Sequence, residues 1–199
     1  MLAVAEKRTR HIRLVIQDVH DPHNISACMR SAEAFGVLNI DIVNVLSKKF
    51  RHGNPSRGSE RWLDINYYND LTSVIGNLKN NGFKIAAGFP DARYQLDEIP
   101  VEQPIAMIFG NEHEGIHSEW ADHIDYPFTI PTVGMVESLN ISVSAALSLH
   151  HICTKSRKTL GDEAYYLKQG DRDQILSNWV RHHCRNFDAE LARMREKKS

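Results

Sequence analysis

The chain has 199 residues, enough to bury a substantial core in one domain but too few for a second full domain. Its formal net charge is −1, and charged residues follow Met1–Ala5 at once, which argues against a signal peptide or a membrane span. Three widely spaced cysteines argue against a disulfide framework, so we expect a cytoplasmic protein with reduced thiols.

The near-zero net charge hides a segregation of charge along the chain. Basic residues gather before residue 14, between residues 48 and 61 and after residue 181, whereas residues 97–125 hold eight acids and no Lys or Arg. Separated basic clusters on a neutral chain fit a polyanion bound at the periphery of an enzyme, and they equally fit solvated surface charge. Charge alone does not decide between these readings.

Strands and helices alternate along the chain. Apolar runs predict strands over residues 11–19, 40–46, 83–89, 105–109 and 126–130. Helical spacing and end signals such as Gly36 and Asn81-Gly82 predict helices over about 24–35, 70–80, 117–123 and 171–187. The alternation predicts an α/β fold, a mostly parallel sheet with helices on both faces. We expect one domain over residues 1–160, with a short basic N-terminal arm, and a helical extension over residues 161–199.

Residues 130–152 combine a strand end, a loop and a further element. Pro131 ends the strand, Gly134 allows a sharp turn, and Ser138 is suited to cap a helix. The apolar residues that follow alternate with period two, which also fits a strand. Many of the intervening residues are small and not β-branched, and the pattern runs on to Ile152, so we interpret it as a helix.

Three polar loops follow predicted strands, at residues 20–24, 110–115 and 131–140. In parallel α/β sheets, ligands bind beyond the carboxyl ends of the strands. The sequence therefore predicts that these loops converge on one site.

The same loops carry motifs of a known family. The blocks HDPHNISACMRSAEAFGV (20–37), IFGNEHEGI (108–116) and IPTVGMVESLNISVSAAL (130–147) resemble motifs one, two and three of the SpoU-type RNA 2′-O-methyltransferases, in order and spacing. The resemblance covers roughly residues 10–155 and is specific because all three motifs coincide.

The resemblance implies the SPOUT fold, whose C-terminal part threads into a trefoil knot. It further implies that S-adenosyl-L-methionine is bound in the knot loops and that the active site is completed across a homodimer. By motif, the expected cofactor contacts are Gly88, Gly110, Ile130 and Leu139. No GxGxxG follows a predicted strand, so a Rossmann-type cofactor site is not expected.

The residues that match the family's functional positions are Asn24, Arg30, Glu112, Ser138 and Asn140. Each also has a structural reading. Asn24 and Ser138 are suited to cap helices, and Arg30 to lie on a helix surface. Glu112 is suited to satisfy backbone N–H groups of the loop, and Asn140 to serve as a structural amide.

The implied chemistry moves a methyl group to a ribose 2′-hydroxyl, which must lose a proton. The family assigns the activating role to the arginine at Arg30, but a guanidinium stays protonated and is a poor base. Arg30 could clamp an adjacent phosphate, or organise a phosphate that accepts the proton. No metal is needed.

Two other functions compete with this one. His113-Glu114-Gly115-Ile116-His117 matches the zinc signature H-E-x-x-H, which needs both histidines on one continuous helix. Gly115 and the apolar strand before the motif favour a loop instead. A non-catalytic RNA-binding relative is the second alternative, and the intact motif residues argue against it.

The resemblance implies an RNA substrate, and we expect no DNA or membrane partner. The motifs are most similar to those of the family's tRNA-modifying members, which act on guanosine 18 of the D-loop. The segment before residue 14 is too short for the separate RNA-binding domain common in ribosomal-RNA relatives. We therefore expect tRNA, with ribosomal RNA as the alternative.

Overall fold

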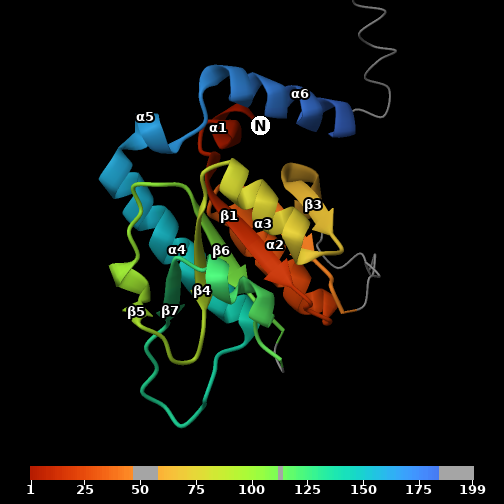
Figure 1. The fold of residues 1–199 in the computed structure, drawn as a ribbon. Helices are drawn as coiled ribbons and strands as arrows, with labels where there is room; N and C mark the ends of the chain where they lie inside the picture. The colour runs from red at the N-terminus through yellow and green to blue at the C-terminus, as the bar shows by residue number, and fades with distance from the viewer. Residues whose placement is uncertain (47–57, 112–113, 184–199) are drawn as a thin grey trace, which may run out of the picture.

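A seven-stranded sheet with the order β3-β2-β1-β6-β4-β7-β5 forms the centre of the protein in a computed structural model (Figure 1). The structure describes residues 1–46, 58–111 and 114–183. Every strand pair is parallel. The strands are β1 (Thr9–Gln17), β2 (Val37–Val43), β3 (Asp64–Tyr68), β4 (Lys84–Gly88), β5 (Tyr94–Gln95), β6 (Ile105–Phe109) and β7 (Tyr126–Thr129).

Helices cover both faces of this sheet, as expected. The helices are α1 (Leu2–Ala5), α2 (Pro22–Ala34), α3 (Leu71–Asn80), α4 (Ile141–Leu160), α5 (Asp162–Tyr165) and α6 (Gln169–His183), with 3-10 turns η1 (Ser59–Trp62), η2 (Leu96–Glu98) and η3 (Ser118–His123). Along β1, Leu14 and Ile16 join the core beneath α2 and α4, whereas Val15 joins the core beneath α3 and η3. Successive side chains of a strand point to opposite faces, so β1 is buried on both.

The predicted α/β fold with a parallel sheet is confirmed, but several details differ from expectation. β1 ends at Gln17 because Asp18 has a φ of +50°, which is incompatible with an extended chain. β2 begins at Val37, directly after the left-handed Gly36, so it starts three residues earlier than predicted. The strands β3 and β5 were not predicted at all. β3 pairs only with β2, at one edge of the sheet, and it lacks a continuous apolar run.

Residues 141–160 form a helix, which settles the ambiguity of their period-two pattern. Ala145, Leu149 and Ile152 are buried at helical spacing, while Val143 and Leu147 lie on the opposite side, 45 % and 46 % exposed. The helix ends at Gly161, whose φ is +77°.

α6 packs against the N-terminal part of the chain. Trp179 stacks edge-on against Trp62 with ring centroids 5.4 Å apart, and the buried Arg8 guanidinium lies 5.3 Å from the Trp179 ring. This layer lies at the opposite end of the sheet from the loop that follows β7 (Figure 1). The predicted end of α6 near residue 187 lies outside the described residues. Within the described ranges, no helix is long and apolar enough to cross a membrane.

Candidate active site

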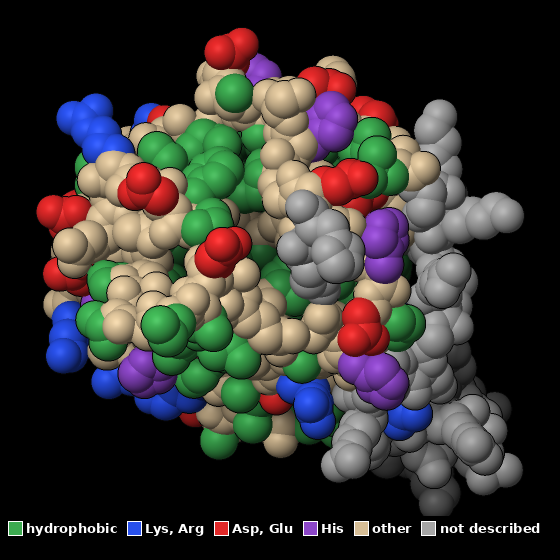
Figure 2. Space-filling view, turned by 90° about the horizontal axis from the view of Figure 1, so that it is seen from below, with side chains coloured by type: hydrophobic (Ala, Val, Ile, Leu, Met, Phe, Trp, Pro, Cys, Tyr) green, Lys and Arg blue, Asp and Glu red, His purple; other side chains and the backbone are tan. Residues whose placement is uncertain are grey.

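A cavity of about 780 Å³ opens at the carboxyl ends of β4, β6 and β7. The strands are parallel, so the segments that leave them meet at one edge of the sheet. In the view onto this edge, apolar side chains lie in a hollow and acidic side chains are found around it (Figure 2). The cavity therefore occupies the position at which parallel α/β sheets bind ligands.

Aromatic side chains form much of one wall. Phe89, Phe109 and Phe128 line the cavity, and the rings of Phe109 and Phe128 meet edge to face at 6.2 Å. A Cβ added to Gly88 would lie 3.3 Å from both of these rings. Gly88 thus leaves room for the two phenylalanines to pack against the strand.

The loop after β6 folds back on itself. Asn111 and Gly115 exchange both backbone hydrogen bonds, at 3.0 and 2.9 Å, and Gly115 has a φ of +70°. A Cβ on Gly110 would lie 2.2 Å from the Gly115 carbonyl oxygen, so no other residue fits there. This closed turn is incompatible with a continuous helix through residues 113–117, which the H-E-x-x-H reading required, and the predicted loop is confirmed. Glu112 and His113 lie outside the described residues.

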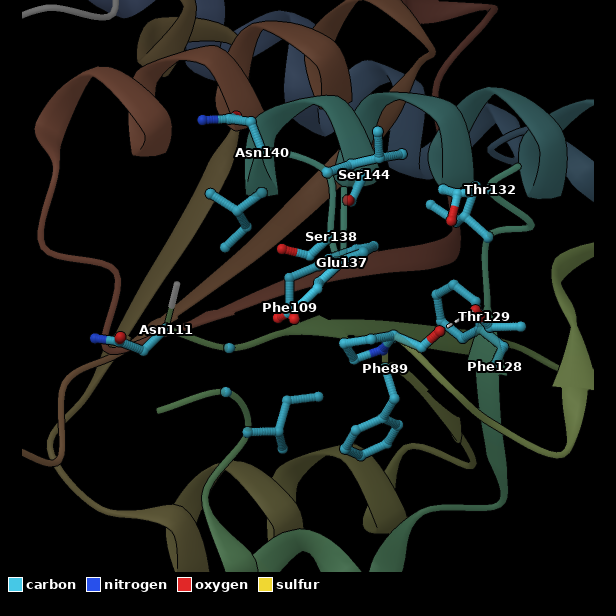
Figure 3. Close-up of a pocket in the computed structure, with 18 of the residues that line it drawn as sticks. Phe89, Phe109, Asn111, Phe128, Thr129, Thr132, Glu137, Ser138, Asn140 and Ser144 are labelled. Carbon is cyan, nitrogen blue, oxygen red and sulfur yellow. Dashed lines mark hydrogen bonds between the residues drawn. The ribbon is translucent and has the colours of Figure 1, made fainter. Parts of the chain in front are cut away.

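The loop after β7 supplies the opposite wall. Residues 131–138 are exposed, and Leu139 is half-buried against the cavity. Ser138 and Glu137 extend from this loop toward the middle of the cavity (Figure 3). The four expected cofactor contacts, Gly88, Gly110, Ile130 and Leu139, all line the cavity.

Asn24 and Asn140 link the start of α2 to the start of α4. The Asn140 side-chain nitrogen donates to Asn24 Oδ1 at 3.2 Å, and Asn140 Oδ1 accepts from Ser142 N at 2.8 Å. Asn140 is therefore the N-cap of α4, and the capping role expected of Ser138 is wrong. Asp21 caps α2 by accepting from His23 N, so the reading of Asn24 as that cap is wrong as well.

Arg30 lies apart from the cavity. It is exposed on α2 and lines a groove of about 410 Å³ between α2 and α4. The other residues of this α2–α4 groove are small or apolar, namely Ala27, Ser31, Ala34, Phe35, Ser142, Val143, Ala146 and Leu147. The structure thus brings Asn24, Ser138 and Asn140 to the cavity or its rim, and leaves Arg30 on a neighbouring surface.

Sequence reasoning missed several residues of this site. Asn111, Glu114 and Glu137 also line the cavity, although all three stand inside the recognised motifs. It also missed Gln17 and Asp18, a buried polar pair at the end of β1. Two adjacent polar residues near the end of an apolar strand were the available signal. In the described part of the chain, no three His, Cys, Asp or Glu side chains are grouped to hold a metal ion.

This chain is similar to known proteins in both sequence and fold. Residues 11–150 match the model of the SpoU rRNA Methylase family. The tRNA (guanosine(18)-2′-O)-methyltransferase of Thermus thermophilus is 32 % identical over 183 residues, covering 89 % of this chain and 92 % of the relative. The enzyme of the same name from Escherichia coli is 32 % identical over 174 residues, covering 85 % and 76 %.

Solved structures agree with these matches. The A. aeolicus TrmH/SpoU tRNA modifying enzyme superposes with a TM-score of 0.81 at 27 % identity, covering 92 % of this chain and 93 % of that one. The SpoU methyltransferase AviRb of Streptomyces viridochromogenes, solved in complex with AdoMet, shares the fold with a TM-score of 0.67 at 19 % identity, covering 80 % and 65 %. The family model spans more than half of the sequence and the Thermus relative nearly all of it, so this chain belongs to the SpoU methylase family.

Proposed function

We propose that this chain transfers a methyl group from S-adenosylmethionine to the ribose 2′-hydroxyl of guanosine 18 in the D-loop of tRNA. One observation carries the proposal. Motif-two and motif-three residues line a single cavity at the carboxyl ends of β4, β6 and β7, in a chain that matches tRNA (guanosine(18)-2′-O)-methyltransferases over most of its length.

The cavity fits the cofactor in size and chemistry. Its volume lies within the range of small-molecule sites, roughly 300–1,000 Å³. The aromatic wall suits a purine base, and Ser138 and Thr132 offer hydroxyl groups. Glu114 and Glu137 also line it, and carboxylates favour a nearby cation. When bound, the cofactor supplies a methyl group activated by a positively charged sulfur.

The chain's own residues must then orient the ribose and provide for its proton. We assign Ser138 and Asn140 to orientation, because both line the cavity and Asn140 is fixed by its hydrogen bonds to Asn24 and Ser142. We propose that Glu112, in the motif-two loop, is also a residue of the active site; it lies outside the described residues.

Arg30 is proposed to bind an RNA phosphate. A guanidinium stays charged at neutral pH, so it cannot take the proton of the 2′-hydroxyl. It can hold a phosphate through two parallel N–H···O bonds. In one form of the mechanism this phosphate only positions the RNA, and in the other it also accepts the proton.

The separation of Arg30 from the cavity supports a homodimer. A single copy leaves Arg30 in the α2–α4 groove, beside the exposed Val143 and Leu147. We propose that a second copy covers this groove and that the pair of subunits completes the site. Small residues such as Ala27, Ser31 and Ala146 suit close packing of helices across such an interface.

Three further proposals concern the knot, the domain bounds and the cellular location. We propose a trefoil knot in the C-terminal part of the fold, as the resemblance of the three motifs to SpoU-type enzymes implies. Residues 1–160 would form the methyltransferase domain and 161–199 an extension. A cytoplasmic location agrees with a tRNA substrate and with the buried thiols of Cys28 and Cys153.

The test uses an unmodified tRNA transcript, purified protein and cofactor, followed by mapping of 2′-O-methylated nucleotides. We expect one mark at guanosine 18, lost when that guanosine is replaced by another base. We also expect activity at subsaturating tRNA to fall steeply with added salt, because phosphate contacts release counterions. If ribosomal RNA were marked and guanosine 18 left untouched, the substrate would be wrong while the methyltransferase class would stand.

A further inference from the structure

Gln17 and Asp18 form a polar pair at the carboxyl end of β1, in the centre of the sheet. Their exposed fractions are 2 % and 1 %, although β1 is otherwise buried through apolar residues at this end. Burying an amide and a carboxylate costs free energy unless their polar atoms find partners. Several partners of this pair lie in residues 111–120, and Asn111 among them lines the cavity.

Each hydrogen bond of the pair has a fixed direction. Gln17 Oε1 accepts from His117 N and from Trp120 Nε1, both at 3.0 Å. Gln17 Nε2 donates to Asp18 Oδ2 at 3.1 Å. Asp18 Oδ1 accepts from Leu46 N at 3.0 Å. The amide must therefore point its oxygen toward η3, and both carboxylate oxygens of Asp18 must act as acceptors.

The backbone of Asp18 takes part as well. Its φ of +50° is left-handed, a conformation that Asp and Asn adopt more readily than most residues. Its N–H donates to Val43 O at 2.8 Å, and its carbonyl oxygen accepts from Asn111 Nδ2 at 2.9 Å. Asn111 in turn closes the turn with Gly115 and lines the cavity.

We propose that Gln17 and Asp18 are positioning residues that hold residues 110–111 and 114–120 in the conformation that binds the cofactor. This inference rests on the proposed function. Gly110, Asn111, Gly115 and Ile116 form one wall of the cavity, and the bonds at Asn111, His117 and Trp120 fix both ends of that wall. If these bonds are lost, the wall must be ordered when the cofactor binds, which weakens binding.

The direction of the bonds allows a test by exchanging the two functional groups. Gln17→Glu alone places two carboxylates face to face, and Asp18→Asn alone places two N–H donors face to face. Both changes keep the size of the side chains. In the double variant Gln17→Glu/Asp18→Asn, the new carboxylate accepts from His117 N, from Trp120 Nε1 and from the new side-chain amide at position 18. The oxygen of that amide accepts from Leu46 N, so every donor regains an acceptor.

The first measurement is the dissociation constant of S-adenosylmethionine, by calorimetry, for the parent, the two single variants and the double variant. We expect each single variant to bind about tenfold more weakly and the double variant to return to within about threefold of the parent. The turnover number at saturating cofactor should change far less than the KM for S-adenosylmethionine. The defect of Gln17→Glu should also shrink as the pH falls, because a protonated carboxyl can again donate to Asp18.

The second measurement is hydrogen exchange of the Trp120 indole N–H and the His117 amide by NMR. Exchange should be slow in the parent and the double variant and faster in the single variants. Thr9→Val is the matched control, because Thr9 is fully buried at the other end of β1 and donates to Tyr165 O at 2.7 Å. It should lower thermal stability without changing cofactor affinity.

The outcomes separate this inference from the proposed function. Single variants with faster exchange but parental affinity would overturn the positioning role, as would a double variant no better than the singles. If a single variant fails to fold, restored folding and affinity in the double variant still support the pairing. A parent that binds no cofactor would reject the proposed function. In that case, exchange at His117 and Trp120 that is slow in the parent, fast in the single variants and slow again in the double variant would retain the positioning of residues 114–120. Any other pattern would reject it.

Discussion

The side chain of Asn140 serves two partners at once: its nitrogen donates to Asn24 Oδ1 at 3.2 Å and its oxygen caps α4 at Ser142 N. Substitutions at this position can separate the two roles. Asn140→Asp keeps a good capping group but removes the donor to Asn24. Asn140→Ala removes both.

We expect Asn140→Ala to lower the free energy of unfolding by about 1 kcal/mol, whereas Asn140→Asp should be nearly as stable as the parent. Both should lose most methyl transfer, because both lose the side-chain N–H that donates to Asn24. Thermal melts and single-turnover methylation give the two readouts. An Asn140→Asp variant with parental activity would show that the N–H donor of Asn140 has no part in the reaction.

Arg30→Ala should reduce methyl transfer by about a hundredfold or more, because a charge-assisted clamp on an RNA phosphate is lost. Cofactor affinity should stay near that of the parent, since Arg30 does not line the cavity. Arg172→Ala, on α6 at the other end of the sheet, is the control. Near-normal turnover of Arg30→Ala would remove this residue from the mechanism.

Leu139→Asp should weaken cofactor binding at least about tenfold, because it places a charge in the wall of the cavity. Leu139→Met, which conserves volume, should bind almost normally. Calorimetric titration with S-adenosylmethionine measures both. Equal affinities for Leu139→Asp and the parent would place the cofactor elsewhere.

Leu147→Asp should convert the proposed dimer to the 22.7 kDa monomer, since it introduces a charge into the α2–α4 groove. Leu2→Asp is the matched control, because Leu2 is 61 % exposed on α1, outside that groove. Sedimentation velocity distinguishes the two species. A parent that sediments only as the monomer at working concentrations would contradict the dimer itself.

His11 should make stability depend on pH. Burial lowers the pKa of His11, and the hydrogen bond between its Nε2 and Val101 O at 2.8 Å only partly offsets this. The folded state therefore binds fewer protons than the unfolded state in the window below the ordinary pKa of about 6.5. The stabilising contribution is complete above that pH and is lost as the pH falls through the lowered value.

Thermal melts of the parent and of His11→Gln between pH 5 and pH 8 check this sign. The difference in melting temperature between the two proteins should be largest at pH 8 and should shrink toward pH 5. A constant difference across this range would contradict it.

The sequence predicted best those elements that are stabilised by burial of their own apolar residues. β6 is buried on every residue and follows Pro104, so its apolar run gave the bounds correctly. The period-two pattern at the start of α4, taken alone, also fits a strand. The segment is a helix because neighbouring elements bury Ala145 and Leu149, which lie on one face of a helix. β3 and β5 lie at the edges of the sheet, where backbone pairing rather than an apolar pattern makes the strand.

The site shows the same division. The resemblance to the family named several residues that line the cavity, among them Gly110, Leu139 and Asn140, because they stand in or beside the motif loops. Other features depend on how segments far apart in sequence meet. These are the partners of Gln17 and the separation of Arg30 from the cavity. Such contacts leave no local pattern to read.

β1 pairs with β2 on one side and with β6 on the other, so its second edge stays open until residues 105–109 have left the ribosome. Gln17 Oε1 has no partner until His117 and Trp120, whose N–H groups donate to it, have also been synthesised. A nascent chain shorter than this carries an unmatched amide in the middle of its future core. We expect a holdase chaperone to retain stalled nascent chains of about 100 residues more strongly than chains long enough for η3 to have left the ribosome.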